Sequence, residues 1–423
     1  MKIAIIGGGA AGCFAAIETA RLLPRADIHI YESLKRPLVK VGLTGGGRCN
    51  LTNSFRHVTS AEQVYPRGAR LMKRLLKEFG PADTMAWFER EGVELVTQTD
   101  ECVFPATQKA STIVDTLTRL LAALHVKLHC ARRVKAIVAT EAGYRLSMAD
   151  GGDVEAQAVV VTTGGYPREA SMSLFRPLAL KTVPPVPSLF SFTLADDRLK
   201  ALSGTVVEQV TARLTTTKFK ATGALLITHM GLSGPAILKL SAYAARHLHD
   251  SGYRATLSIN WWGEATEDDI LATLRSHAAT LSARQTGTTT PPHLCRRLWH
   301  YLLDAAHIAP HRRWSELQPK ELRRLAALLS NHQLSLTGRN PYKEEFVTCG
   351  GIALSEIVPS TLESRAHRHL YFAGEALDVD AVTGGFNLQA AWSMGYVVAR
   401  SLSRALADDN DNAANANEAC PMD

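Results

Sequence analysis

Three glycines near the start of the chain, Gly7, Gly9 and Gly12, have the GxGxxG spacing, and Glu32 follows roughly 20 residues later. In this pattern the first glycine permits a tight turn, the second lets a pyrophosphate approach the backbone, and the third permits close packing of a helix on a strand. A helix that begins at such a turn directs N–H groups and the positive end of its dipole toward phosphate. A carboxylate at Glu32 can accept hydrogen bonds from ribose hydroxyls and disfavours a 2′-phosphate. These four residues predict a dinucleotide-binding site.

The segments around these residues follow the strand–helix–strand pattern that such a site requires. The run KIAII is short and apolar, as in a buried strand, and the run AAGCFAAIETARLL is rich in alanine, as in a helix. The run ADIHIYES predicts a second strand that ends beside Glu32. Because all of these parts are present, a glycine turn that only packs is the weaker interpretation.

The far half of the chain has related features. The run Val159–Thr163 predicts a buried strand, and Gly164 follows it directly. Near the C-terminus, HLYFAGEALDVDAVTGGFNLQ predicts a strand, a turn at Gly374, a second glycine pair from Gly384 and a helix from about Asn387. A second helix N-terminus preceded by glycines suits the ribityl–pyrophosphate part of a flavin dinucleotide. We therefore predict one dinucleotide-binding fold that is built from both ends of the chain.

The segment between these two parts has a different composition. The runs SLFSFTLAD, TVVEQVTARLTTT and RATLSINWW lie within residues 188–263 and predict strands. Residues 264–333 are rich in leucine, alanine and arginine and predict helices, the first of which begins with a capping box at Thr266 and Asp269. Strand-like residues return from 334. The last fifteen or so residues are rich in Asn, Asp and Ala, and we expect them to be disordered.

Composition places broad limits on partners and location. The net charge is +7, but lysine and arginine are scattered among 40 acidic residues, so a solvated basic face is favoured over a nucleic-acid partner. The seven cysteines show no metal-ligand spacing, and their odd number favours a reducing, cytoplasmic location. We expect no metal site, no secretory signal and no membrane span, since the N-terminus and the apolar runs have neither pattern.

Five segments together are similar to the BaiN-type, aminoacetone oxidase-like family of FAD-binding flavoproteins. They are GLTGGGRCNLTN, CVFPATQKASTIVDTL, GALLITHMGLSGPAILKLS, FVTCGGIALSEIVPSTLESR and LYFAGEALDVDAVTGGFNLQAAWSMG, and they span almost the whole chain. The resemblance implies an α/β fold: a Rossmann-like FAD-binding domain of the glutathione-reductase type, fumarate reductase subclass, with an inserted β-barrel domain and a small helical insert. One segment departs from the family, because YPREASMSLFRPLALK replaces a longer glycine-rich loop. This departure weakens any transfer of a substrate from another member.

On this basis we expect four parts of the chain. The helical insert would be residues 264–333, and the disordered tail would be residues 409–423. The remaining two parts are each discontinuous: the FAD-binding domain comprises 1–187 and 346–408, and the β-barrel domain comprises 188–263 and 334–345.

The resemblance also implies roles for the segment GLTGGGRCNLTN, residues 42–53, which we call the second glycine-rich segment. In this fold class it passes beside the flavin, so the backbone N–H groups of Gly45, Gly46 and Gly47 would face the cofactor. Arg48 would donate charge-assisted hydrogen bonds to phosphate or to the reduced ring, and Asn50 would cap the turn or bond a flavin carbonyl. The start of the last helix would present N–H groups to the pyrimidine edge of the ring. In all, the residues expected to bind FAD are Gly7, Gly9, Ala11, Gly12, Glu32, Gly46, Gly47, Arg48, Asn50, Val134, Gly164, Gly374, Glu375, Gly384, Gly385, Phe386, Asn387 and Leu388.

The expected reaction is hydride transfer, because that is the chemistry of a flavin. The sequence has no second GxGxxG, so NAD(P)H would bind only transiently, as a reductant. The resemblance implies either oxidation of a small organic substrate, such as an amine, or NAD(P)H-dependent reduction of one. The alternative is a flavin-binding sensor or interaction protein whose basic helical insert docks a partner such as RNA. No attachment motif is recognisable, so the flavin is expected to be non-covalent.

No catalytic residue is assigned, but two side chains are candidates. Cys49 could be a redox partner of the flavin, although a buried thiol is often only structural. His229 follows a predicted strand in ITHMGLSGPAIL and could relay a proton or only fix the loop. Tyr342 and Lys343 lie where the chain returns to the FAD-binding domain and, on position alone, would border the substrate cleft.

Overall fold

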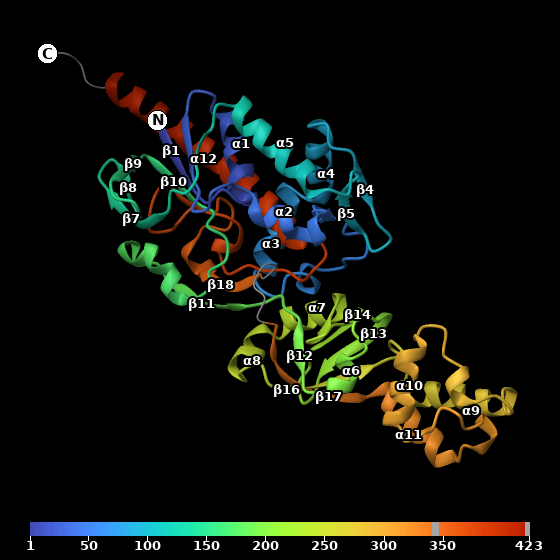
Figure 1. The fold of residues 1–423 in the computed structure, drawn as a ribbon. Coiled ribbons are helices and arrows are strands. Elements are labelled where there is room, and N and C mark those ends of the chain that lie inside the picture. The colour runs from blue at the N-terminus through green and yellow to red at the C-terminus, as the bar shows by residue number, and fades with distance from the viewer. Residues whose placement is uncertain (341–346, 419–423) are drawn as a thin grey trace. The chain divides into compact units, whose positions relative to one another are not determined.

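The computed structural model describes residues 1–340 and 347–418 of the chain (Figure 1). The chain divides into two compact units, Met1–Pro187 with Val347–Asp423, which we call the sheet unit, and Ser188–Phe346, which we call the barrel unit. The sheet unit thus combines both ends of the chain. Among the helices of the described residues, none has the length and apolarity needed to cross a membrane.

A five-stranded parallel sheet forms the centre of the sheet unit. Its strands in spatial order are β19 (Leu370–Phe372), β10 (Ala158–Val161), β1 (Lys2–Ile6), β2 (Asp27–Tyr31) and β6 (Lys127–His129). The strands are mostly apolar and buried, as expected for parallel strands that are covered on both faces. Because β19 from the C-terminal part pairs with β10, the prediction of one fold built from both chain ends is confirmed.

Helices cover one face of this sheet, and a small antiparallel sheet covers the other (Figure 1). On the first face, α1 (Ala10–Leu22) packs against α5 (Ala110–Ala123) and α12 (Phe386–Glu418). The contact with α12 is close, because a Cβ added at Gly395 would lie 3.0 Å from the carbonyl oxygen of Ala11. The opposite face is covered by β7 (Val134–Thr140), β8 (Gly143–Met148) and β9 (Asp153–Ala156).

Shorter elements complete the sheet unit. A second antiparallel pair, β11 and β18, lies where the chain leaves and re-enters this unit. The bounds of the shorter elements are α2 (Val39–Gly47), β3 (Thr52–Asn53), α3 (Ala69–Glu78), α4 (Pro81–Arg90), β4 (Leu95–Thr97), β5 (Cys102–Pro105), η2 (Glu169–Leu178), β11 (Thr182–Pro187), β18 (Thr348–Ile352) and η6 (Gly374–Ala376).

The C-terminal tail differs from its prediction. Disorder was predicted from residue 409, but α12 continues through Glu418. From Ser401 to Glu418 the chain is rich in alanine and contains neither glycine nor proline. A helix already nucleated by packing gains one backbone hydrogen bond for each residue added, whereas a composition rule considers only the missing apolar residues. Residues 419–423 lie outside the described part.

A closed six-stranded β-barrel forms the core of the barrel unit, in agreement with the predicted β-barrel domain. Fully buried side chains such as Leu225, Leu232 and Leu257 fill it. Three short helices accompany the strands: α6 (Asp197–Lys200), α7 (Pro235–Tyr243) and α8 (Ala245–Asp250). In spatial order the strands are β12 (Phe192–Leu194), β15 (Gly231–Ser233), β14 (Lys220–Ile227), β13 (Val206–Leu214), β16 (Ala255–Asn260) and β17 (His332–Arg339).

The helical insert lies between β16 and β17 and comprises α9 (Glu267–Thr280), α10 (Arg296–Ala305) and α11 (Pro319–Ser330). As predicted, α9 begins with a capping box, in which the Thr266 hydroxyl accepts from the Asp269 N–H at 3.2 Å. Buried leucines of the insert belong to the same hydrophobic cluster as those of the barrel. The insert is therefore part of the barrel unit, and the barrel resumes at residue 332 instead of the predicted 334.

Candidate active site at the glycine-rich turns

In the glycine turn between β1 and α1, Gly7 and Gly12 are closely packed, whereas Gly9 has open space beside it. A Cβ added at Gly7 would lie 2.4 Å from the carbonyl oxygen of Thr162, and one at Gly12 would lie 2.0 Å from the carbonyl oxygen of Gly7. No heavy atom comes within 4 Å of a Cβ added at Gly9. The first and third glycines are therefore required by packing, and the second leaves open the approach that a pyrophosphate needs.

Glu32 follows β2, and its buried carboxylate is held by the backbone. One oxygen accepts from the N–H of Gly8 and the other from the N–H of Leu34, each at 2.7 Å. The bond to Gly8 ties the end of β2 to the glycine turn, as predicted from the spacing. A carboxylate oxygen accepts more than one hydrogen bond, so both oxygens retain capacity for ribose hydroxyls.

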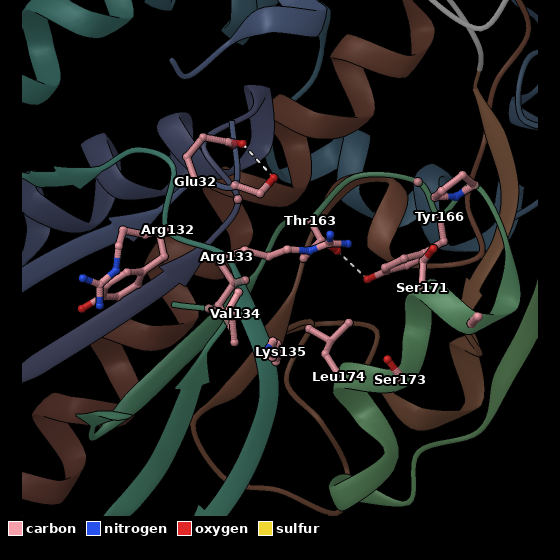
Figure 2. Close-up of a pocket in the computed structure, with 18 of the residues that line it drawn as sticks. Glu32, Arg132, Arg133, Val134, Lys135, Thr163, Tyr166, Ser171, Ser173 and Leu174 are labelled. Carbon is pink, nitrogen blue, oxygen red and sulfur yellow. Dashed lines mark hydrogen bonds between the residues drawn. The ribbon is translucent and has the colours of Figure 1, made fainter. Parts of the chain in front are cut away.

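A cavity of about 680 Å³ opens beside this turn and is lined by Gly7, Glu32 and Val134, three of the predicted residues (Figure 2). The lining also contains residues that sequence reasoning missed. In Figure 2 the side chain of Arg133 points toward Thr163. These missed lining residues include Arg132, Arg133, Lys135, Thr163, Tyr166 and Arg176. No motif identifies them, because they come from β7 and the turn before it, from the segment after β10 and from η2, none of which has a distinctive spacing.

The second glycine-rich segment begins at the end of α2 and continues as a turn. Gly42 lies within α2, and the helical geometry is interrupted from Thr44. Gly45, Gly46 and Gly47 have φ of 60°, 66° and 82°, a region that favours glycine. An added Cβ would meet the backbone nitrogen of Asn50 at 2.9 Å from Gly45 but nothing within 4 Å from Gly46 or Gly47. The latter two leave an open surface.

Arg48 and Cys49 follow this turn and face different environments. The exposed Arg48 guanidinium lies over the Phe104 ring, 4.5 Å from its centroid, and its Nε donates to the carbonyl of Gly45 at 3.2 Å. The Cys49 thiol is fully buried, and burial raises its pKa to about 12. A thiol with that pKa is not a thiolate near neutral pH, which argues against the redox role considered for Cys49.

The start of α12 is held against the segment that follows α2. With its amide oriented by hydrogen bonding, Asn50 donates to the carbonyl of Thr52 at 2.9 Å and accepts from the N–H of Gly385 at 3.2 Å. A Cβ added at Gly385 would lie 2.4 Å from the same carbonyl. The close approach at Gly385 therefore involves the protein backbone of β3. The side chain of Asn387 is also occupied, because it exchanges two hydrogen bonds with the backbone of Ala381 at 2.9 and 3.0 Å.

Glu375 connects three segments of the candidate site. One of its carboxylate oxygens accepts from the Lys40 ammonium of α2 and from the N–H of Gly165, both at 3.1 Å. A Cβ added at the neighbouring Gly374 would meet the Ala11 side chain of α1 at 3.2 Å. Among the other predicted residues, Gly164 has a φ of 73° and Leu388 is half-buried. A Cβ added at Gly384 would lie 2.7 Å from the Phe386 ring.

Three of the candidate residues lie outside the sheet unit or outside the described residues. His229 is exposed in the turn between β14 and β15 and belongs to the barrel unit. Tyr342 and Lys343 lie outside the described residues. The site described above therefore consists of residues from the sheet unit.

The residues present fit a flavin dinucleotide. Open glycine backbone at positions 9, 46 and 47 and the cavity beside the Glu32 carboxylate give the donors and space that its phosphates and adenosine need.

The family model of the HI0933-like protein Rossmann domain matches residues 1–401 of the chain. The chain is 29% identical over 413 residues to the 3-dehydro-bile acid delta(4,6)-reductase of Clostridium scindens, covering 95% of this chain and 98% of that protein. It is 28% identical over 407 residues to the ribosomal RNA dihydrouridine synthase of Escherichia coli, covering 94% and 97%. A structure of quinol fumarate reductase from E. coli has a TM-score of 0.49 at 15% identity, covering 99% of this chain and 74% of that chain. The resemblance in the sequence is thus confirmed, and the chain belongs to the HI0933-like family of Rossmann-fold flavoproteins and is an FAD-dependent oxidoreductase.

Proposed function

We propose that the chain is a reductase that receives hydride from NAD(P)H and adds it to a carbon–carbon double bond conjugated with a carbonyl group. The observation that carries the proposal is the chemistry named in the two relatives. One acts on a 3-dehydro-bile acid as a delta(4,6)-reductase, and the other makes dihydrouridine in ribosomal RNA. Both names describe reduction of a double bond that is conjugated with an oxo group. We therefore transfer this type of reaction to the chain, and neither of the two substrates.

The chain's own residues would hold FAD without a covalent bond. Gly9 would leave space for the pyrophosphate, the N–H groups at the start of α1 would donate hydrogen bonds to it, and the Glu32 carboxylate would accept hydrogen bonds from the ribose hydroxyls. Gly46, Gly47 and the start of α12 would bound the ring. When bound, the flavin supplies the hydride that the substrate receives.

The Glu375 carboxylate accepts hydrogen bonds from the Lys40 ammonium and the Gly165 N–H. These two bonds fix α2 against the turn after β10. Glu375 is therefore a positioning residue in this proposal.

A proton must also reach the reduced substrate. His229, exposed in the turn between β14 and β15, is our candidate for this step, because imidazole is the side chain most often used for general acid–base catalysis. Cys49 is not proposed, since its buried thiol is protonated and shielded from solvent.

Anaerobic spectroscopy tests the proposal. The purified full-length protein is mixed with NADH, NADPH or a panel of small amines, and the absorbance of the oxidised flavin is followed. We expect a pyridine nucleotide to bleach the flavin, and a conjugated enone such as a 3-oxo-4,6-diene steroid, or a uridine-containing RNA, to restore its absorbance without oxygen. Bleaching by an amine and not by a pyridine nucleotide would contradict the proposal, and so would a flavin that neither nucleotide reduces.

A further inference from the structure

Arg133 is held in place by backbone hydrogen bonds and lines the cavity beside the glycine turn. It lies in the turn just before β7. The N–H of the preceding Arg132 donates to the carbonyl of Glu32 at 2.8 Å, and the carbonyl of Arg133 accepts from the N–H of Ala149 at 2.7 Å. The turn is therefore tied both to the end of β2 and to the end of β8, which fixes the position of Arg133 in the cavity wall.

The side chains of these two neighbouring arginines have different surroundings. The Arg132 guanidinium is paired with the Asp150 carboxylate at 3.2 Å. Within the described residues, the Arg133 guanidinium forms no ion pair and no hydrogen bond, and in Figure 2 it points toward Thr163. The charge and the donors of Arg133 are thus available to a ligand in the cavity.

Two hydroxyl groups lie where Arg133 points. The Thr163 and Tyr166 hydroxyls are hydrogen-bonded to each other, as the dashed line in Figure 2 shows. Because one of them donates to the other, one O–H remains able to donate elsewhere. Tyr166 is buried, and its ring packs edge-on against that of Phe175 with the centroids 5.9 Å apart, so its hydroxyl is held in place. We call Arg133, Thr163 and Tyr166 the cavity cluster.

The cavity cluster adjoins the glycine turn at which the pyrophosphate is expected. A Cβ added at Gly7 would lie 3.0 Å from the Cα of Thr163, so the backbones of these two residues are in direct contact. The helix α1 begins at Ala10, in the same turn. A phosphate group that binds at this turn can therefore meet donors from the helix N-terminus and from the cavity cluster.

The N-terminus of α1 alone does not match the charge of a pyrophosphate. Its dipole amounts to about half an elementary charge, and its first turn, AAGC, contains no lysine or arginine. Two cations of the second wall of the site are already engaged. The Lys40 ammonium donates to Glu375 at 3.1 Å, and Nε of Arg48 donates to the carbonyl of Gly45 at 3.2 Å.

The lining of the cavity also favours an anion. Glu32 is the one carboxylate among the described residues that line it, and backbone N–H groups already hold both of its oxygens. The lining cations are Arg132, Arg133, Lys135 and Arg176. A cation that lines a cavity interacts with an anion more strongly than one on an open surface, because less water screens the two charges.

We propose that Arg133, supported by the hydroxyls of Thr163 and Tyr166, donates charge-assisted hydrogen bonds to the pyrophosphate of FAD. The planar fork of a guanidinium matches two phosphate oxygens, which an ammonium group does not. The proposal rests on the FAD site proposed above and does not depend on which double bond is reduced. It assigns to Arg133 the contact with phosphate that the family resemblance implied for Arg48.

Titration of the flavin-free full-length protein with FAD, followed by flavin fluorescence, tests this role. Arg133→Met removes the charge but keeps a long side chain, and Arg133→Lys keeps a charge without the fork. Arg168→Met is the matched control, because Arg168 is exposed near Tyr166 in the sequence, does not line the cavity and loses the same charge. Competition with ADP and with adenosine separates contacts to phosphate from contacts to the nucleoside.

We expect Arg133→Met to bind FAD at least about tenfold more weakly than the parent, as the loss of a charge-assisted hydrogen bond implies. Arg133→Lys should bind with intermediate affinity, and Arg168→Met should stay within about twofold of the parent. The preference for ADP over adenosine should fall in Arg133→Met by the same factor as the affinity for FAD. The unfolding midpoint without flavin should not change, because the Arg133 side chain loses no bond to the protein.

Full FAD affinity in Arg133→Met, an equal loss in Arg168→Met, or an equal weakening of ADP and adenosine would overturn the proposal. A parent that takes up no FAD would refute the FAD site and the role of Arg133 together. The expected loss in Arg133→Met, found in a protein whose flavin NAD(P)H does not reduce, would refute the reductase and support the role of Arg133.

Discussion

Gly9 and Gly12 lie in the same turn of the chain but have different surroundings. A Cβ at Gly12 would meet the carbonyl oxygen of Gly7 at 2.0 Å, whereas a Cβ at Gly9 would meet no atom within 4 Å. The Gly9 backbone also has a negative φ of −85°, which any residue adopts. These two positions allow the packing and binding roles of the turn to be tested separately.

We expect Gly12→Ala to lower the free energy of unfolding by about 1–3 kcal/mol or more, because the helix must move away from the strand. Gly9→Ala should cost less than about 1 kcal/mol and should weaken FAD binding at least about tenfold, since the methyl group occupies the pyrophosphate approach. Urea unfolding without flavin and a fluorescence titration with FAD measure the two effects. Equal destabilisation by both substitutions would show that the turn only packs.

Cys49→Ala should retain turnover within about twofold. The thiol is buried and protonated, so its removal takes away a small apolar contact and no reactive group. Steady-state rates with NAD(P)H and the preferred acceptor measure this. A drop in kcat of more than about tenfold, with the flavin still bound, would restore Cys49 as a redox partner.

Residue patterns predicted the parts of the site that depend on local backbone geometry. Gly7, Gly9, Gly12 and Glu32 could be placed from spacing alone, because a tight turn before a helix requires them in that order. The position of Asn387 could also be predicted, but not its side-chain role. That role depends on the backbone of Ala381, which a turn brings back to it.

At the scale of elements, the start of α12 is fixed by β3. Gly385 has a φ of 88°, and an added side chain would meet the Thr52 carbonyl at 2.4 Å. Gly385→Val should therefore destabilise the junction of α12 with β3 and lose FAD together with the fold around it. Thermal unfolding and flavin content of the purified variant test this. A Gly385→Val protein with the parent's unfolding midpoint that lacks FAD would instead place the flavin directly against this glycine.

Element boundaries were predicted where the sequence carries a local signal. The capping box fixed the start of α9, and the Gly-Gly pair preceded the start of α12. The end of α12 and the interruption of α2 were not predicted. The end of α12 depends on how far the helix extends beyond its packed part. The interruption of α2 depends on consecutive glycines that adopt positive φ directly after a helical turn.

At the scale of the whole molecule, a buried hydrogen-bonded chain joins the barrel to its helical insert. The Trp261 indole donates to Nδ1 of His332 at 3.2 Å, and the Tyr301 hydroxyl, 3.5 Å from Nε2 of the same ring, donates to Asp196 at 2.6 Å. Burial lowers the pKa of His332 from 6.5 to about 4, against a smaller opposing effect of the Asp196 carboxylate. The folded protein therefore keeps this ring neutral.

The stability of the barrel unit should fall as the pH is lowered from about 6.5 to about 4. In that window the unfolded chain binds a proton at His332 and the folded chain does not, which removes up to about 3 kcal/mol. Urea unfolding at about pH 7 and about pH 4.5 tests this, with His332→Gln as the comparison, because glutamine can still accept from the indole but does not titrate. Equal losses in the parent and the variant would contradict the assignment.

The net charge of the whole chain does not show how charge is divided between the two units. Averaged over 423 residues, the net charge of +7 favoured a solvated basic face. The barrel unit contains 19 Lys and Arg residues and 13 Asp and Glu residues, whereas the sheet unit contains 28 and 27. The His332 network joins Asp196, Tyr301 and His332, which lie far apart in the sequence, so local patterns could not predict it.

The identity and attachment of the flavin test the central claim most directly. The purified full-length protein is precipitated with acid, and the flavin in the supernatant is quantified and identified by mass spectrometry. We expect about one FAD per chain in the supernatant, as a single non-covalent dinucleotide site requires. Flavin that remains with the precipitate, flavin mononucleotide in place of FAD, or a protein that neither contains nor takes up flavin would contradict the account.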